Sequence, residues 1–280
     1  MNDIAIQFLY GTLPGRGILK LIINTRFDRL IVRFLRSRWS RPLVFWYARQ
    51  HNIQMDAAQL RRYDTFRDFF ARERSSTCID YTPEHLISPC DGWLKAYPIE
   101  EGSSFAIKRT RYSLEDLLDD PLLAKHYEGG MCLVFRLCAS DIHHYCYIDD
   151  SYLWQNHYIP GELHSVQPIA CETYPVYTLN RRCWCLMVTE NFGPVIQTEI
   201  GALTVGGIVN TFENGRVCRG DEKGHFELAG SSIVLLFEPN RVRMISGIQR
   251  ESKAGREVRV RQGMWIGSRW VQSSEAKRST

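Results

Sequence analysis

The sequence predicts an α+β protein, in which N-terminal amphipathic helices precede a compact, β-rich sandwich or barrel-like body with few helices. Apolar and basic residues recur at helical spacing through residues 1–75. From Ile87 onward, short apolar and β-branched runs alternate with turn residues, a pattern typical of strands. Glycines recur between these runs, as they do at the corners of sandwiches and small barrels. We therefore divide the chain into a helical region, residues 1–75, and a β-rich body, residues 76–280.

Composition and charge limit the classes of protein to consider. With 280 residues, of which 44% are apolar and 24% charged, the chain can bury a substantial core and is not disordered throughout. Its net charge is only +4, but residues 1–50 contain nine Lys or Arg and two Asp, a net charge of +7. A basic and partly apolar front end predicts an anionic partner surface, either a membrane or a nucleic acid.

Targeting and redox signals favour a reducing compartment. No run of 18 uninterrupted apolar residues occurs, so we expect no transmembrane helix. The start of the chain lacks the basic opening and long apolar core of a secretion signal. The nine cysteines are an odd number without repeated spacing, which favours free thiols.

The basic helical region suits a membrane surface. Four arginines recur three and four residues apart and so line one helical face: Arg26, Arg29, Arg33 and Arg36. Trp39 and Trp46 follow among further arginines, and this mixture is typical of a helix that lies among lipid headgroups. A helix hairpin packed on the protein's own core, with solvated arginines, explains the same pattern. For Phe66, Phe69 and Phe70, which share one helical face, core packing is the expected role.

Within the body, one helix and several strands are predicted. Residues 113–128 fit a helix, with Ser113 as its N-cap and acidic residues in its first turn. The strands are predicted from apolar and β-branched runs: residues 131–137, 184–189, 195–200, 204–210 and 233–237. The last of these directly follows the turn signal Gly230-Ser231-Ser232.

The Gly230–Ser231 bond is the candidate site of a self-cleavage. A serine hydroxyl can attack the neighbouring glycine carbonyl, because glycine has no Cβ to obstruct the approach. The amide becomes an ester, the ester eliminates, and the dehydroalanine left at the new amino end hydrolyses to a pyruvoyl group. The hydroxyl needs a base that takes its proton. Taken alone, these residues are more typical of an ordinary turn that enters a core strand.

Histidines and a carboxylate are the candidates for activating that hydroxyl. His143 and His144 follow the predicted strand 131–137, and adjacent side chains on an extended segment point to opposite sides. Only one of them can therefore face a given pocket, where imidazole serves as base or acid near neutral pH. Asp91, in an Asp-Gly turn, either orients a histidine or is structural. His164 is a further candidate, although a structural role is expected.

Other polar residues are ambiguous. Lys223 and His225, in a charged loop before the cleavage candidate, either reach the reacting group or are solvated. A zinc site made of His143, His144 and Cys146 is poorly spaced and lacks an obvious distant pair. We therefore predict no metal.

Several short segments carry a resemblance when they are taken in order and with their spacing: residues 63–72, 88–92, 135–137 with 141–143, 161–166, 191–193, 199–202, 205–206, 219–224 and 230–232. Together they resemble the phosphatidylserine decarboxylase family, from about Leu9 to about Gly267. The resemblance implies cleavage between Gly230 and Ser231 into residues 1–230 and 231–280. The smaller chain would begin with a pyruvoyl cofactor made from Ser231.

The resemblance also implies roles for the candidate residues. Asp91 and a histidine would form a relay with Ser231; we favour His143, with His144 next. The product would be a carboxy-lyase that converts phosphatidylserine to phosphatidylethanolamine and CO2, with the cofactor as electron sink. Its partners would be phosphatidylserine in an anionic membrane and its own cleaved chains, without nucleic acid; a homodimer is left open. Its place would be peripheral, on the cytoplasmic side of the cell membrane.

The sequence departs from the family pattern at two points. The family often has Asp-Tyr-His-Arg-x-His, and its second histidine is replaced here by Cys146, which leaves the identity of the relay base open. The cleavage motif reads Ala-Gly-Ser-Ser, where Gly-Ser-Thr is commoner. The alternatives are an unprocessed, non-catalytic membrane-binding homologue and a pyruvoyl decarboxylase of a soluble amino acid. A nucleic-acid-binding protein ranks below these.

Overall fold

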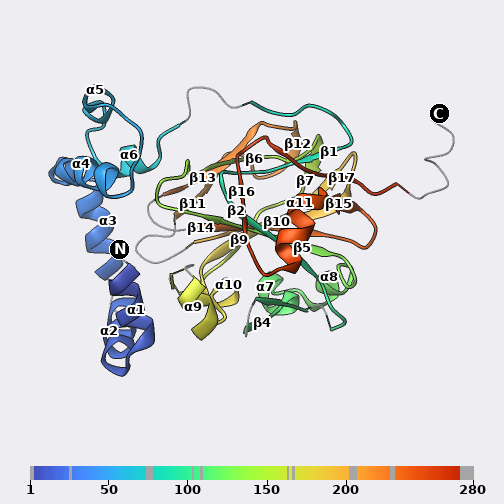
Figure 1. The fold of residues 1–280 in the computed structure, drawn as a ribbon, viewed down its shortest axis with the longest axis horizontal. Helices are drawn as coiled ribbons and strands as arrows, with labels where there is room; N and C mark the ends of the chain where they lie inside the picture. Colours follow the sequence, from blue (N-terminus) through green and yellow to red (C-terminus); the bar gives the residue numbers. More distant parts are fainter. Residues whose placement is uncertain are drawn as a thin grey trace.

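The structure of the chain, a computed structural model, describes residues 3–24, 27–73, 78–102, 104–107, 110–162, 164–165, 168–201, 207–227 and 231–271. Figure 1 shows the N-terminal helices on one side of a body made mainly of strands, with a few short helices at its edges. The described strands form antiparallel sheets and no closed barrel. The predicted α+β class, with a β-rich body, is confirmed.

The N-terminal part is helical, as predicted. Its elements are α1 (Asp3–Gly11), α2 (Leu13–Asn24), α3 (Phe27–Leu35), the 3-10 turn η1 (Arg38–Ser40), α4 (Arg41–Gln50), α5 (Ala57–Leu60) and α6 (Phe66–Phe70). Phe66, Phe69 and Phe70 are buried in a small apolar cluster that also contains Val44 and Ala48 of α4. The core role expected for these aromatic residues is confirmed. This cluster is separate from the two cores of the β body.

The body is built on a nine-stranded antiparallel sheet. Its order is β12 (Gly215–Val217), β7 (Ser151–Leu153), β9 (Arg182–Thr189), β10 (Gly193–Ile200), β14 (Ser231–Phe237), β5 (Met131–Leu137), β2 (Gly92–Pro98) and β16 (Val258–Val260), with β8 (His157–Ile159) also paired to β9. Every residue of β14 is buried. Val234 and Leu236 belong to one core and Ile233, Leu235 and Phe237 to the other. A strand covered on both faces needs a continuous apolar run, and that run at residues 233–237 is the signal that predicts this strand.

Smaller sheets and helices complete the body. One sheet contains β1 (His85–Ile87), β15 (Val242–Met244) and β17 (Trp265–Arg269), and another contains β6 (His144–Cys146), β11 (Gly207–Asn210) and β13 (Glu222–Glu227). A hairpin is formed by β3 (Ser104–Ile107) and β4 (Thr110–Ser113). The helices of the body are α7 (Leu114–Leu118), α8 (Pro121–Lys125), α9 (Pro168–Thr173), α10 (Val176–Leu179) and α11 (Ser246–Lys253). Residues 131–137 form β5 as predicted, and the runs at 184–189, 195–200 and 233–237 lie within β9, β10 and β14. Of the run 204–210, the described part forms β11.

The single helix expected over residues 113–128 is wrong. Ser113 does cap a helix, because its hydroxyl accepts a hydrogen bond from the Asp116 amide. That helix, α7, ends at Leu118, and the next residue, Asp119, has a left-handed backbone with φ of 55°. Asp120 then caps a second helix, α8, which begins with Pro121. A left-handed residue followed by a new cap and a proline ends one helix and starts the next, although the apolar spacing continues.

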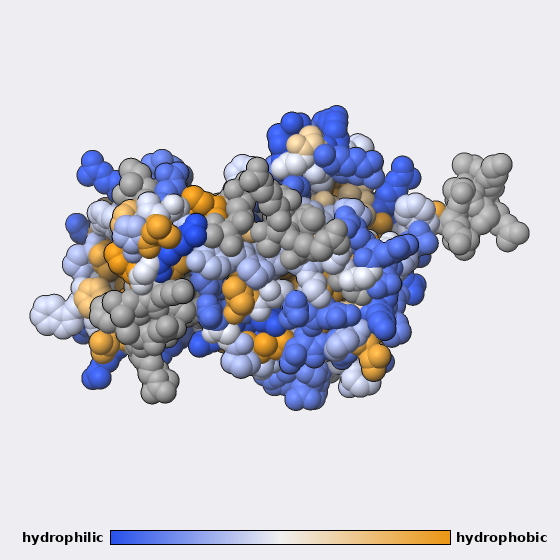
Figure 2. All heavy atoms as spheres, turned by 90° about the horizontal axis from the view of Figure 1, so that it is seen from below, coloured by the Kyte–Doolittle hydropathy of each residue, from blue (hydrophilic) through white to orange (hydrophobic). Residues whose placement is uncertain are grey.

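The helical part exposes several large apolar side chains. Its exposed large apolar side chains are Phe8, Leu13, Ile18, Leu30, Phe34, Trp39, Phe45 and Trp46. Figure 2 shows apolar residues gathered over this part of the molecule, while the body presents a mostly polar face. Among the described helices, none combines the length and the apolar character needed to cross a bilayer.

Candidate active site

Three chain segments that are distant in sequence meet where three neighbouring strands of the large sheet, β14, β5 and β2, begin or end. Strands β5 and β14 are antiparallel, and Leu137 at the end of β5 pairs with Ser231 at the start of β14. Gly92, the first residue of β2, approaches the same end so closely that a Cβ there would lie 2.8 Å from the Arg136 carbonyl oxygen. The same end of these strands therefore brings together Asp91, the loop after β5 and Ser231.

His143 and Ser231 are in direct contact at this end of the strands. The His143 Nδ1 lies 3.0 Å from the Ser231 Oγ, and its Nε2 lies 3.1 Å from the Cys138 carbonyl oxygen. A carbonyl only accepts hydrogen bonds, so the proton of a neutral His143 is on Nε2. The Nδ1 lone pair is then free to accept the serine proton. This is the arrangement that a general base for Ser231 requires.

The surroundings keep His143 neutral. Both His143 and Ser231 have no exposed surface. Burial, and then the positive charge of Arg72, lower the pKa of His143 from 6.5 to about 4. The Phe70 ring packs against the imidazole with 4.2 Å between ring centroids, and Phe226 meets it edge-on. The base is therefore unprotonated at neutral pH.

Asp141 and Arg259 shape the loop that holds His143. The Asp141 carboxylate accepts a hydrogen bond of 2.7 Å from the Cys138 amide, and it pairs with Arg259 through both oxygens. Arg72 donates to the Ser140 and Asp141 carbonyls. These contacts fix the Cys138 carbonyl that accepts from His143. No sequence pattern indicates these roles of Asp141, Arg259 and Arg72, although Asp141 stands only two residues before His143.

Asp91 lies at the same end of these strands and accepts a hydrogen bond from another segment. It is 4% exposed, and its Oδ1 accepts a hydrogen bond of 3.0 Å from the Gln262 amide. The two ring nitrogens of His143 already face Ser231 and Cys138. The orienting contact to His143 therefore comes from a backbone carbonyl.

His144 points away from the Ser231 contact. Its Nδ1 lies 2.9 Å from the Glu222 Oε1 and its Nε2 lies 3.1 Å from the Ala71 carbonyl oxygen. The two adjacent histidines thus diverge, as expected for an extended segment. His164 is elsewhere, where its ring lies between Tyr10 and Glu162, and this supports the structural role expected for it.

Lys223 is neither solvated nor free. It has no exposed surface, and its Nζ lies 2.9 Å from the Glu199 Oε1, itself completely buried. The same Nζ donates to the Asn210 side chain. Cys146, at the position of the family's second histidine, is also fully buried, and burial raises its pKa to about 12. A thiol with that pKa is not a base at neutral pH.

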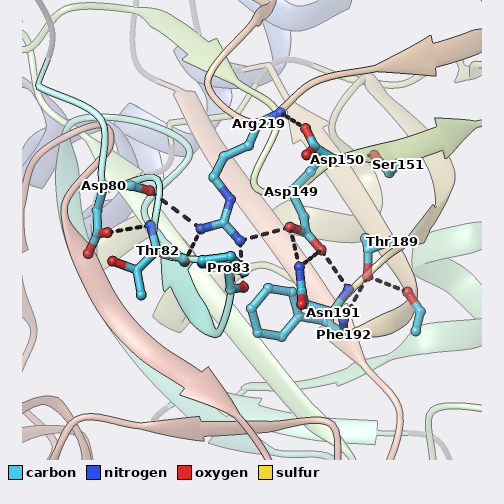
Figure 3. A network of polar contacts seen from close by, with 11 residues as sticks. Asp80, Thr82, Pro83, Asp149, Asp150, Ser151, Thr189, Asn191, Phe192 and Arg219 are labelled. Atoms are coloured by element: carbon cyan, nitrogen blue, oxygen red, sulfur yellow. Dashed lines mark hydrogen bonds and ion pairs between the residues drawn. The ribbon is translucent and has the colours of Figure 1, made fainter.

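Two segments that contributed to the resemblance have a structural role in a buried polar network (Figure 3). Arg219 and Asp149 are 5% and 1% exposed and pair at 2.8 Å. Asp149 also accepts hydrogen bonds from the Asn191 amide and side chain. Arg219 donates to the backbone carbonyls of Asp80, Thr82 and Pro83. This network joins the loop before β13, the turn between β9 and β10, and the segment that leads into β1.

Comparison with known proteins identifies the family. A family model described as phosphatidylserine decarboxylase matches residues 66–267. The chain is 40% identical to phosphatidylserine decarboxylase proenzyme 2 of Clostridium acetobutylicum over 269 residues, 94% of this chain and 91% of that protein. The chain belongs to the phosphatidylserine decarboxylase family. The sequence resemblance is thereby confirmed, and with it the expectation of an enzyme, a carboxy-lyase.

Further relatives extend the same match. The phosphatidylserine decarboxylase proenzyme of Clostridium kluyveri is 36% identical over 273 residues, 95% of this chain and 92% of that protein. That of Ruminiclostridium cellulolyticum is 35% identical over 271 residues, 94% of this chain and 90% of that protein. The family match includes His143, Asp141, Ser231 and Arg259, so the residues around the Ser231 contact lie within it. Gly230, the predicted partner of Ser231 in cleavage, is outside the described residues.

Proposed function

We propose that this protein decarboxylates phosphatidylserine to phosphatidylethanolamine after cutting its own chain between Gly230 and Ser231. The observation that carries the proposal is the contact between the Ser231 Oγ and the unprotonated Nδ1 of His143. The names of the relatives, which describe proenzymes of phosphatidylserine decarboxylase, agree with a chain that matures.

Self-cleavage follows from chemistry at Ser231. His143 takes the hydroxyl proton, and the oxygen attacks the Gly230 carbonyl carbon. The C–N bond breaks as a C–O bond forms, which turns the amide into an ester. Loss of the Ser231 α-proton then expels Gly230 as a carboxylate. The dehydroalanine that remains takes up water and releases ammonia, which leaves a pyruvoyl group.

The position of Ser231 suits a residue that becomes a prosthetic group. Strand β14 is paired along its length with β5 and β10, so residues 231–280 would stay bound to the sheet after cleavage. Its first residue would remain against His143. The pyruvoyl group, once present, supplies a carbonyl that takes up the substrate amine and accepts the electrons released with CO2. His143 would hold or move a proton beside that carbonyl.

The helical region would bring this site to its lipid. We propose that it attaches peripherally to an anionic membrane on the cytoplasmic side of the cell membrane. Trp39 and Trp46 are 84% and 58% exposed, among arginines that favour anionic headgroups. Exposed aromatic rings beside basic residues are suited to the interface between headgroups and acyl chains.

The proposal is tested by comparing two adjacent serines. Wild-type protein incubated with phosphatidylserine vesicles is expected to form phosphatidylethanolamine and CO2. Ser231→Ala is expected to remain one chain and to form neither product. Ser232→Ala removes a neighbouring buried hydroxyl from the same strand and is expected to leave chain splitting in place. Activity in unsplit Ser231→Ala would contradict the proposal.

A further inference from the structure

Two histidines and a glutamate converge on one face of the small sheet. The donor atoms of His144, Glu222 and His225 lie within 4.8 Å of one another. The Glu222 Oε1 is 2.9 Å from the His144 Nδ1 and 3.9 Å from the His225 Nδ1. The two imidazole rings stack, with 5.0 Å between their centroids.

A β-bulge brings these residues together. His144 of β6 pairs directly with His225 of β13, and Cys146 pairs with Glu222. In a regular strand, Glu222 and His225 would point to opposite faces, because they are three residues apart. The register shifts between Glu222 and Gly224, so that Lys223 is an additional residue. The bulge therefore turns Glu222 to the face of the two histidines and sends Lys223 into the core.

The hydrogen bonds of His144 leave a place for a cation. Its Nε2 faces the Ala71 carbonyl, which can only accept, so this nitrogen carries a proton. The Nδ1 of a neutral His144 then presents a lone pair to the Glu222 carboxylate, which also presents lone pairs. Two acceptors at this distance need a positive charge between them, either a second proton on His144 or a metal ion.

We propose that His144, Glu222 and His225 bind a divalent transition-metal ion, with Zn²⁺ as the expected occupant. Two imidazoles and one carboxylate are a common ligand set for Zn²⁺. The Ala71 carbonyl would hold the His144 ring as a backbone partner does for ligating histidines. The His225 Nδ1, 3.9 Å from the same carboxylate oxygen, would supply the third ligand.

The site also has access and room. The Glu222 side chain is 44% exposed. His144 and Glu222 line a pocket of about 330 Å³ that opens beside Tyr81, whose side chain is exposed. This pocket would admit the ion and leave a coordination position for water. Spacing along the chain did not indicate the site, because the residues that complete it with His144 stand in a distant strand and depend on the bulge.

A bound ion would link three parts of the chain. It would join β6, which begins one residue after the proposed base His143, to β13, which leads toward Ser231. Through His144 it would also fix Ala71 at the end of α6. An ion that binds only the folded chain raises its thermal stability. This inference stands independently of the proposed enzymatic function.

The experiment uses untagged, full-length protein dialysed against a chelator. Isothermal titration calorimetry with Zn²⁺ is expected to show one equivalent bound, with a rise in Tm. His225→Ala and Glu222→Gln are each expected to weaken binding by about 10- to 100-fold or more and to remove the rise in Tm. His126→Ala changes an exposed histidine elsewhere and is expected to bind as wild type.

Two outcomes would overturn the inference. One is wild-type protein that binds Zn²⁺ no more tightly than the combined His225→Ala, Glu222→Gln variant. This result would mean that a proton alone lies between His144 and Glu222. The other is a loss of binding in His126→Ala equal to that in His225→Ala. Far-UV circular dichroism of each variant, compared with wild type, ensures that folded proteins are compared; if His225→Ala does not fold, His225→Gln takes its place.

Discussion

The Ser231 Oγ lies 3.0 Å from the Nδ1 of His143, and both side chains are completely buried. A nucleophile and its base are thus in contact before any reaction, with the imidazole held by the Cys138 carbonyl on its other nitrogen. Burial is also what keeps the base neutral, since removal from solvent disfavours its charged form. The contact and the lowered pKa of His143 have the same origin in the packing around β14.

The first prediction concerns pH. The pKa of His143 is lowered from 6.5 to about 4, so the fraction of His143 that is unprotonated stays nearly constant above about pH 5. Self-cleavage of freshly refolded chain should therefore be insensitive to pH between about 6 and 8, and should fall by half as pH decreases through about 4. Gel densitometry over time measures the rate, with circular dichroism at each pH as a control. A rate that already halves near pH 6.5 would show that His143 is not desolvated as described.

The second prediction concerns the loop that holds His143. Arg259→Met removes the partner of Asp141, whose side chain is 1% exposed. Arg259 itself is 42% exposed, so the expected loss of stability is modest, about 1–2 kcal/mol. Splitting should also slow, because Asp141 fixes the Cys138 amide. Arg256→Met, which breaks an exposed pair with Glu251, is the matched control and should change neither quantity.

Much of the fold could be predicted because its signals are local. The strand at residues 131–137 is mostly buried and β14 is buried throughout, and their apolar sequences alone indicate strands. The break between α7 and α8 is not predicted, because apolar residues continue at helical spacing past Asp119. The left-handed backbone of Asp119 nevertheless ends α7. The divergence of His143 and His144 was also predictable, since it depends only on extended geometry.

The parts of the site that could not be predicted depend on long-range contacts. Arg259 reaches Asp141 across more than a hundred residues, and no local pattern indicates which carboxylate it meets. The sequence places Lys223 in a charged loop, because a lone lysine gives no sign that a bulge directs it to Glu199. Which partner a buried charge finds is set by tertiary packing.

The third prediction concerns the Arg219–Asp149 network. Arg219→Met would leave the Asp149 carboxylate buried without its cation, and the expected loss is about 3–5 kcal/mol. Urea denaturation in a Ser231→Ala background, where the chain is expected to remain whole, measures it. Arg241→Met, at an exposed pair with Glu238, should cost less than about 1 kcal/mol. Equal effects of the two substitutions would show that the buried network is not needed for stability.

The fourth prediction concerns membrane attachment. Replacing both Trp39 and Trp46 by Ala removes exposed aromatic surface from the helical part without opening a core. Binding to phosphatidylserine-containing vesicles in a sedimentation assay should weaken by about tenfold or more. Trp154→Ala changes a similarly exposed residue of the body, 57% exposed, and should bind as wild type. Unchanged binding of the double variant would place the membrane contact elsewhere.

The most direct test of self-cleavage is the intact mass of freshly purified wild-type protein. Cleavage by the route described should give residues 1–230 with an ordinary carboxyl end, and residues 231–280 lighter by one ammonia than simple hydrolysis would leave them. His143→Ala should give the uncleaved chain. A wild-type sample that consists of one intact chain, or of a small fragment that begins with unmodified serine, would contradict the account.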